Sequence, residues 1–296
     1  MDRPAGAPAV VDTDWAFDRY EQVRPRLVAA TFPAASERVG DVAAIADRFD
    51  AFVLDAFGVL NIGETAVPGA VARIAQLRRA GKRLVVLTNG ATQSRAAALA
   101  KYHALGFDFA PEEVVASRDL AADALRERDG LLWAAASGPN PDFGDLGVPV
   151  HDLLADEALF ETADGFVLFS SAAWTRHHQD RLAETLARRP RPVLVANPDI
   201  VAPREDRFSL EPGHYAHRLQ DELGLAPEFY GKPYAGAFDA ARERLGPEIP
   251  PARIAMVGDT LHTDVLGGRA ALMGTILIEA HGLFRGRDVT PYIARS

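Results

Sequence analysis

The sequence predicts an α/β protein whose core is a doubly wound, Rossmann-like parallel sheet with an inserted α/β cap domain. Apolar runs at residues 51–54, 84–87 and 254–257 have the length and composition of strands that helices cover on both faces. Segments with helical spacing of apolar residues alternate with these runs, as in βαβ units. Near residue 130 the alternation stops, and this change marks the start of the insert.

We therefore divide the chain into three parts. They are an N-terminal helical extension over residues 1–44, a core over 45–127 and 227–296, and a cap over 128–226. The first dozen or so residues of the extension are rich in Ala and Pro, and we expect them to fray. A helical pattern begins at Asp14 and is interrupted at Pro25, and a second short helix is predicted near residues 42–48.

The core begins with two strand–helix units. After the strand at 51–54, a stripe of Val71, Ile74 and Leu77 predicts a helix that ends at Gly81. The elements that we expect next are a strand at 83–87, a helix at 93–103, a strand at 114–116 and a helix at 119–126.

The insert begins with a turn-rich cluster at residues 137–142. Its predicted elements are strands at 165–169 and 192–196, with a helix at 178–188 between them. Beyond it the core alternation resumes, with strands at 229–231, 254–257 and 275–278 and helices at 237–245 and 264–272.

Composition excludes several classes of function. The net charge of −9 argues against bulk attraction to nucleic acid or to an anionic membrane. The chain has no cysteine, which excludes disulfides, thiolate zinc sites and a thiol nucleophile. No signal peptide or membrane-spanning run is recognisable, so we expect a soluble cytoplasmic protein. The N-terminal extension has no functional motif; we expect it to pack on the core or on a partner in a homodimer.

Polar side chains suited to phosphate chemistry follow four of the apolar runs. In chain order they are Asp55, Thr88 with Asn89, Lys232, and Asp259. Ligands of open α/β sheets bind beyond the carboxyl ends of the strands, so these groups are expected to converge on one crevice. A carboxylate, a hydroxyl, an ammonium and a second acidic segment together indicate metal-assisted phosphoryl transfer.

Each of these residues also has an ordinary structural explanation. Asp55 could attack phosphorus, or it could belong to a simple turn. Thr88 and Asn89 could hold phosphate oxygens or cap the following helix. Lys232 could neutralise a phosphate or lie in solvent, and no Walker loop surrounds it.

The second acidic segment, at residues 258–264, offers two carboxylates around a strand-to-helix turn. Asp259 and Asp264 are hard oxygen ligands that suit Mg²⁺, although Asp264 could instead cap the helix.

In combination and in this order, the segments resemble the haloacid dehalogenase superfamily. The phrases at residues 67–70, 196–199 and 258–264 look like its class IIA, nitrophenylphosphatase-like branch. The resemblance implies that Asp55 is the nucleophile and a Mg²⁺ ligand, that Thr88 and Lys232 hold the phosphate, and that Asp259 binds Mg²⁺ with support from Asp264. It also implies a mobile cap over a small phosphorylated metabolite. Candidates to face the substrate are Asn197, Asp199, Arg204, His214 and Tyr215.

The sequence departs from that family at Phe57. Phosphatases of the family carry there a second aspartate, which protonates the leaving oxygen. The backbone carbonyl of Phe57 could still bind the metal, but its side chain cannot transfer a proton. An uncharacterised class IIA subgroup that this segment also resembles carries an aromatic residue at the same position.

Three functions are compatible with this departure. The first is a Mg²⁺-dependent phosphatase that takes its proton from His214 or His262, or whose leaving group needs none. The second is a protein that binds a phosphorylated ligand without turnover. The third is a dehalogenase-type hydrolase, which the intact segment at residues 258–264 argues against. We rank the phosphatase first and the dehalogenase last.

Overall fold

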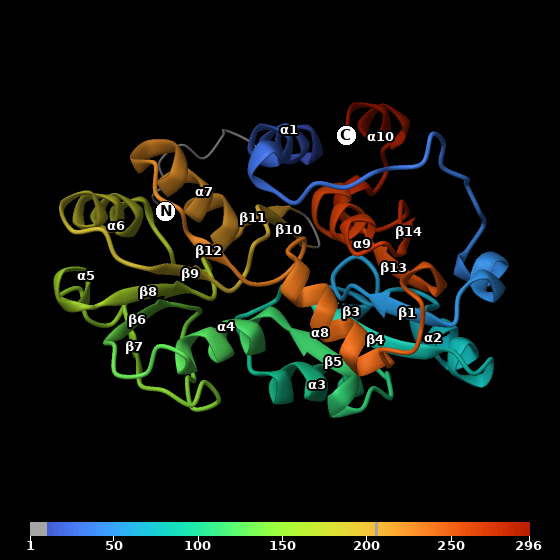
Figure 1. The fold of residues 1–296 in the computed structure, drawn as a ribbon, viewed down its shortest axis with the longest axis horizontal. Helices are drawn as coiled ribbons and strands as arrows, with labels where there is room; N and C mark the ends of the chain where they lie inside the picture. The colour runs from blue at the N-terminus through green and yellow to red at the C-terminus, as the bar shows by residue number, and fades with distance from the viewer. Residues whose placement is uncertain (1–10, 205–206) are drawn as a thin grey trace.

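Two parallel five-stranded sheets lie side by side in the computed structural model, which describes residues 11–204 and 207–296 (Figure 1). The first sheet has the order β14 (Gly274–Leu277), β13 (Ile254–Gly258), β1 (Ala51–Leu54), β4 (Arg83–Thr88) and β5 (Val114–Ala116). Because all of its neighbours pair in parallel, the carboxyl ends of its strands meet at one edge. The predicted α/β fold class is confirmed.

The second sheet is formed by strands of the insert and by one strand that directly follows it. Its order is β12 (Glu228–Phe229), β9 (Val193–Val195), β8 (Gly165–Leu168), β6 (Trp133–Ala136) and β7 (Val150–Asp152). One prediction is wrong here: the strand at Phe229 pairs with β9 and does not belong to the core sheet. The register explains the difference, because Phe229 lies opposite Val195 and packs against the apolar cluster of the insert.

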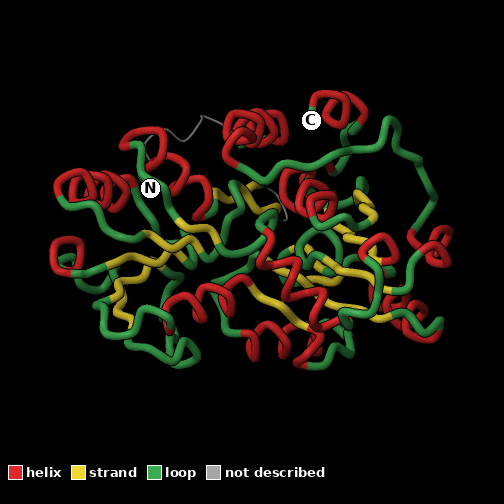
Figure 2. The backbone as a smooth tube through the Cα atoms, viewed as in Figure 1, coloured by secondary structure: helices red, strands yellow, loops and turns green. Residues whose placement is uncertain are grey.

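Helices cover both faces of the two sheets (Figure 2). Those of the core are α2 (Ala70–Arg79), α3 (Arg95–Ala104), α4 (Ser117–Arg126), α8 (Ala235–Leu245) and α9 (Leu266–Ala270). Those of the insert are α5 (Leu159–Thr162), α6 (Arg176–Arg188) and α7 (Pro212–Leu223). The chain also has α1 (Thr13–Val23) and α10 (Thr290–Arg295) near its ends, while residues 42–48 form a 3₁₀ helix. The predicted fraying of the first residues falls mostly outside the described residues.

Burial of alternating side chains fixes each sheet between its helices. On β1, Phe52 and Leu54 face one apolar cluster while Ala51 and Val53 face the other. On β8, Phe166 and Leu168 likewise face away from Val167. Burying side chains of this size contributes about 1.5–3 kcal/mol each. This two-sided burial explains the continuous apolar runs of the sequence.

Two short hairpins lie near the edge where the core strands end. They are β2 (Asn61–Ile62) with β3 (Thr65–Ala66), and β10 (Val201–Pro203) with β11 (Phe208–Leu210). The helix predicted over 264–272 is shorter than expected: a π-helical turn occupies residues 261–265, and the α-helix follows it.

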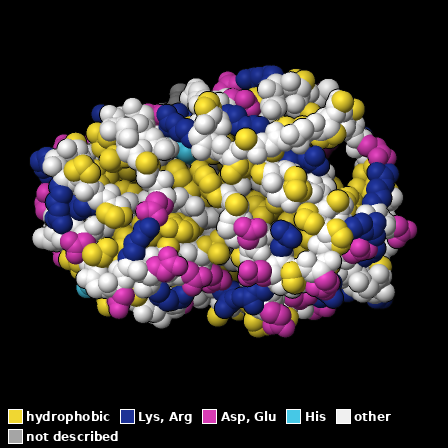
Figure 3. Space-filling model, viewed as in Figure 1, with side chains coloured by type: hydrophobic (Ala, Val, Ile, Leu, Met, Phe, Trp, Pro, Cys, Tyr) yellow, Lys and Arg dark blue, Asp and Glu magenta, His cyan; other side chains and the backbone are white. Residues whose placement is uncertain are grey.

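Charges are mixed on the surface. On the face drawn in Figure 3, basic and acidic side chains are interspersed. Among the described residues, no helix has the length and apolar character needed to cross a membrane.

Candidate active site

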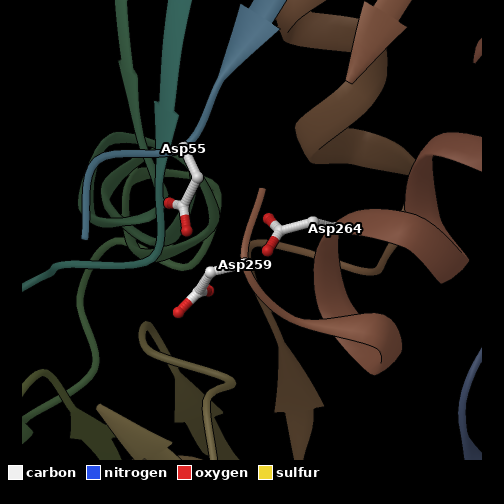
Figure 4. A group of neighbouring side chains, drawn as sticks. All are labelled: Asp55, Asp259 and Asp264. Atoms are coloured by element: carbon white, nitrogen blue, oxygen red, sulfur yellow. The ribbon is translucent and has the colours of Figure 1, made fainter. Parts of the chain in front are cut away.

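Three buried carboxylates meet at the edge where β1 and β13 end. Asp55 directly follows β1, Asp259 directly follows β13, and Asp264 lies in the helical turn after it. Each offers a carboxylate oxygen, and these oxygens lie within 4.8 Å of one another. Figure 4 shows the three side chains gathered where β1 ends. The predicted convergence of the two acidic segments is therefore present in the fold.

Lys232 joins two of these carboxylates. Its ammonium nitrogen lies 2.5 Å from Oδ1 of Asp55 and 2.7 Å from Oδ1 of Asp264, and the side chain is 2% exposed. Burial alone would lower the pKa of the Lys232 ammonium, but the charges of Asp264 and Asp55 outweigh it and raise that pKa above its ordinary value. Lys232 is therefore a fixed positive charge beside the candidate nucleophile.

The position of Asp259 is fixed by hydrogen bonds and close packing. Its Oδ2 accepts from the backbone N–H of Leu283 at 2.8 Å, and its Oδ1 accepts from the Thr260 hydroxyl at 2.8 Å. A Cβ on Gly58 would lie 2.7 Å from Oδ2 of Asp259, and one on Gly282 would lie 1.8 Å from it. Glycine is required at both places because the two turns close tightly around the carboxylate.

The charges of this cluster do not balance. Burial raises the pKa of Asp55 to about 7, against the opposing charge of Lys232. Burial, followed by the charges of Asp55 and Asp264, raises the pKa of Asp259 to about 8. The Lys232 ammonium pairs with Asp55 and Asp264 of the three carboxylates, and a divalent cation would compensate the remaining negative charge. Because these are oxygen ligands held close together, the site suits a hard divalent metal ion.

Thr88 is the last residue of β4, and Asn89 follows it, beside the cluster. The Thr88 hydroxyl oxygen accepts from the backbone N–H of Gly90 at 3.0 Å. The Asn89 side chain bridges two segments: its Oδ1 accepts from the Lys232 N–H at 2.7 Å, and its Nδ2 donates to Asp199 at 2.9 Å. Asn89 thus fixes the backbone that carries Lys232 and ties it to the insert.

A cavity of about 310 Å³ opens beside the carboxylates. Asp55, Thr88, Asn89 and Asp259 line it from the core, and Asn197, Asp199 and Arg204 line it from the insert. Burial raises the pKa of Asp199 to about 7. The cavity is therefore lined both by the carboxylates of the core and by polar side chains of the predicted cap.

Phe57 lies in this cavity. The Lys101 ammonium is 5.3 Å from the centre of its ring, and the Arg204 guanidinium carbon is 5.7 Å from it. Both distances lie within the usual range of cation–π contacts. Its side chain therefore presents an apolar ring flanked by positive charge.

Five of the predicted residues do not line the cavity. Lys232 and Asp264 belong to the carboxylate cluster beside it, and the other three, His214, Tyr215 and His262, lie elsewhere. His214 is 3% exposed and packs against Trp15 of α1. Tyr215 belongs to the apolar core of the insert. The imidazole Nε2 of His262 lies 2.5 Å from a carboxylate oxygen of Glu21.

Sequence reasoning also missed residues that line or shape the site. Lys101 and Tyr102, both on α3, line the cavity, and the Leu283 N–H holds Asp259. Their local sequence carries no motif, and only the chain topology brings them to the site. The repeated strand–helix alternation predicted a helix over residues 93–103 but did not indicate what Tyr102 would lie against.

Two family models match the chain. The model described as haloacid dehalogenase-like hydrolase matches residues 52–139, and a HAD-hydrolase-like model matches residues 229–293. The matched ranges contain Asp55, Lys232 and Asp259. An acid sugar phosphatase from Staphylococcus aureus (strain MRSA252) is 26% identical over 235 residues, covering 78% of this chain and 87% of that protein.

Solved structures give the same grouping. A Cytophaga hutchinsonii protein described as a "possible sugar phosphatase" has a TM-score of 0.73 at 26% identity, covering 82% of this chain and 88% of that one. A 4-nitrophenylphosphatase from Thermotoga maritima has a TM-score of 0.65 at 25% identity, covering 79% and 87% of the two chains. The sheet order and the carboxylate cluster thus occur in a chain whose relatives are phosphatases.

Proposed function

Because this chain belongs to the haloacid dehalogenase-like hydrolases, we propose that it is a Mg²⁺-dependent phosphatase that forms a phosphoryl-enzyme on Asp55. The observation that carries the proposal is the buried cluster of Asp55, Asp259 and Asp264, which is joined by Lys232 and opens onto a cavity. The cysteine-free composition is compatible with a cytoplasmic location.

Asp55 acts as the nucleophile in the first step. Its carboxylate oxygen forms a bond to phosphorus while the bond to the ester oxygen breaks. Lys232 would neutralise charge that develops on the phosphoryl oxygens, and the Thr88 hydroxyl would donate a hydrogen bond to one of them. Mg²⁺, held by the three aspartates and the Phe57 carbonyl, would supply further electrostatic stabilisation of the transferring group. Water then breaks the bond between phosphorus and Asp55 and releases inorganic phosphate.

The leaving oxygen determines which esters turn over well. Phe57 holds no proton to donate, and His214 and His262 lie away from the cavity lining. A positioned general acid contributes roughly 10²–10⁴ in rate, so esters with good leaving groups are favoured. The cavity volume of about 310 Å³ favours a small phosphorylated metabolite.

Phe57 also favours a second candidate. A protein that keeps every phosphate-binding group and lacks the proton donor could bind a phosphorylated ligand without hydrolysing it. The matched phosphatases and the intact acidic cluster place turnover ahead of this alternative.

A phosphometabolite screen tests the proposal. Wild type and Asp55→Asn are compared with Mg²⁺ and with EDTA, and inorganic phosphate is measured. We expect release that requires both Mg²⁺ and Asp55. Release that persists in Asp55→Asn or in EDTA would refute the mechanism, and binding without release would favour the second candidate.

A further inference from the structure

The helix α1 lies between the insert and the core. In Figure 1 it occupies the top of the molecule between α7 and α10. Its buried residues Phe17 and Tyr20 share one apolar cluster with Ile200 of the insert and with Leu261 and Leu283 of the core. One element therefore contacts both parts of the protein close to the cavity.

On the insert side, α1 holds the loop that carries Asp199. The Tyr20 hydroxyl oxygen accepts from the backbone N–H of Ile200 at 3.1 Å, and this bond is buried. The neighbouring Asp199 accepts from Asn89 at 2.9 Å. The preceding residue, Arg19, also pairs with the insert: its guanidinium nitrogen lies 2.7 Å from a carboxylate oxygen of Asp221 on α7. The Asp199 loop is thus held from both sides, by Tyr20 of α1 and by Asn89 of the core.

On the core side, α1 holds the turn that carries Asp264. The Glu21 carboxylate accepts from Nε2 of His262 at 2.5 Å, and His262 is fully buried. The ring of Tyr20 stacks on the same imidazole, with centres 4.9 Å apart and planes at 6°. Two consecutive residues of α1 therefore fix one buried side chain two positions before Asp264.

A third contact reaches the loop that holds Asp259. The Thr13 hydroxyl donates to the carbonyl of Leu283 at 2.9 Å, and the N–H of Leu283 donates to Asp259. Three of the polar contacts of α1 are thus made with loops or turns that border the site.

We propose that Tyr20 and Glu21 are positioning residues of this active site, with Tyr20 fixing the Asp199 loop and Glu21 fixing the turn of Asp264. This inference rests on the proposed function for its kinetic readouts. The N-terminal helix is then part of the active-site framework, and the insert is held against the core by a segment that precedes the first strand of the sheet.

The variant Tyr20→Phe tests the insert side. It keeps the ring that stacks on His262 and removes only the hydroxyl, leaving the buried Ile200 N–H without that acceptor. We expect KM to rise roughly tenfold, while the Mg²⁺ concentration for half-maximal activity stays unchanged. Amide hydrogen exchange in a peptide over residues 197–201 should become faster, and that readout needs no turnover.

The variants Glu21→Ala and Glu21→Gln test the core side. Glutamine keeps an oxygen that can accept from His262, whereas alanine removes it. We expect Glu21→Ala to raise the half-maximal Mg²⁺ concentration roughly tenfold and Glu21→Gln to restore it to near the wild-type value. Asp18→Asn is the matched control on the same helix, because Asp18 makes an exposed pair with Arg295. It should change neither quantity.

If Tyr20 and Glu21 only stabilise the fold, the variants should behave differently. Thermal stability would fall in Tyr20→Phe and Glu21→Ala, while KM, Mg²⁺ dependence and loop exchange measured well below the melting temperature would match wild type. That outcome overturns the inference. If wild type shows no phosphate release that depends on Asp55, the proposed function fails separately. Loop exchange and calorimetric Mg²⁺ binding then decide the role of α1.

Discussion

Phe57 defines the chemistry of the site at the scale of single residues. Its ring lies in the cavity near Asp55 and close to the charges of Lys101 and Arg204. An apolar ring there excludes water and can pack against the carbon skeleton of a substrate, but it has no proton to give. The proposed nucleophile and the predicted metal ligands are unaffected, so the expected deficit is confined to protonation of the leaving group.

Replacing this ring by a carboxyl should restore proton transfer. We expect Phe57→Asp to raise kcat for alkyl phosphates by on the order of 10²-fold and to change kcat for p-nitrophenyl phosphate much less, because nitrophenolate leaves without protonation. The control Phe57→Asn introduces a side chain of the same size as aspartate but without an acidic proton. It should raise kcat for neither substrate. Steady-state kinetics on both substrates decide the matter. An equal rise on both substrates would contradict a missing acid.

At the scale of elements, the site depends on tight turns after strands. The turn after β1 and the loop after β14 close around Asp259, and Gly58 and Gly282 provide the close approach. Both glycines have a positive φ, 79° and 73°, which L residues seldom adopt. The turns therefore combine an unusual backbone conformation with contact against a predicted metal ligand.

Two glycine substitutions separate these effects. Gly58→Ala places a Cβ 2.7 Å from Oδ2 of Asp259, whereas Gly69→Ala, at φ +82°, meets nothing within 4 Å. Both changes carry a backbone cost of about 1–2 kcal/mol. We expect Gly58→Ala alone to weaken Mg²⁺ binding at least about tenfold, measured by calorimetry. Equal Mg²⁺ affinity in the two variants would show that the close contact does not position Asp259.

At the scale of the whole molecule, buried histidines of α7 lie where the insert meets α1. Burial lowers the pKa of His214 to about 3, and the charges of Arg19 and Arg218 act in the same direction. Burial likewise lowers the pKa of His217 to about 4. In the unfolded chain both would titrate near pH 6.5. Below about pH 6.5 these histidines are protonated in the unfolded state but not in the folded state. The free energy of unfolding therefore falls as the pH drops below about 6.5.

The variant His214→Phe isolates one of these contributions. It keeps an aromatic ring beside Trp15 and removes the titratable group. Between pH 7 and pH 5, wild type should lose about 2 kcal/mol more unfolding free energy than the variant. Urea denaturation at the two pH values measures this difference, and other titrating groups cancel in the comparison. Identical losses would mean that His214 does not titrate on unfolding.

Much of the site could be predicted because its signals are local. Asp55, Thr88 and Asp259 each come at the end of an apolar run, and a parallel sheet brings the ends of its strands together. Lys232 was predicted for the right crevice although its preceding strand belongs to the second sheet. A two-residue strand carries too little pattern to decide which sheet it joins.

The contributions of α1 could not be predicted from sequence. Tyr20 contacts Ile200, and Glu21 contacts His262, at separations of 180 and 241 residues. Helical spacing predicts that Phe17 and Tyr20 are buried, but it does not identify what they are buried against. For His214 the prediction is wrong in the opposite sense. The sequence suggested it as a proton donor at the site, but its ring packs against Trp15 and does not line the cavity.

A crystal structure of the protein with Mg²⁺ and beryllofluoride tests the central claim most directly. The account predicts a metal ion bound among Asp55, Asp259 and Asp264, and a beryllofluoride group bonded to a carboxylate oxygen of Asp55. An empty cluster, or beryllofluoride bound anywhere other than Asp55, would contradict it.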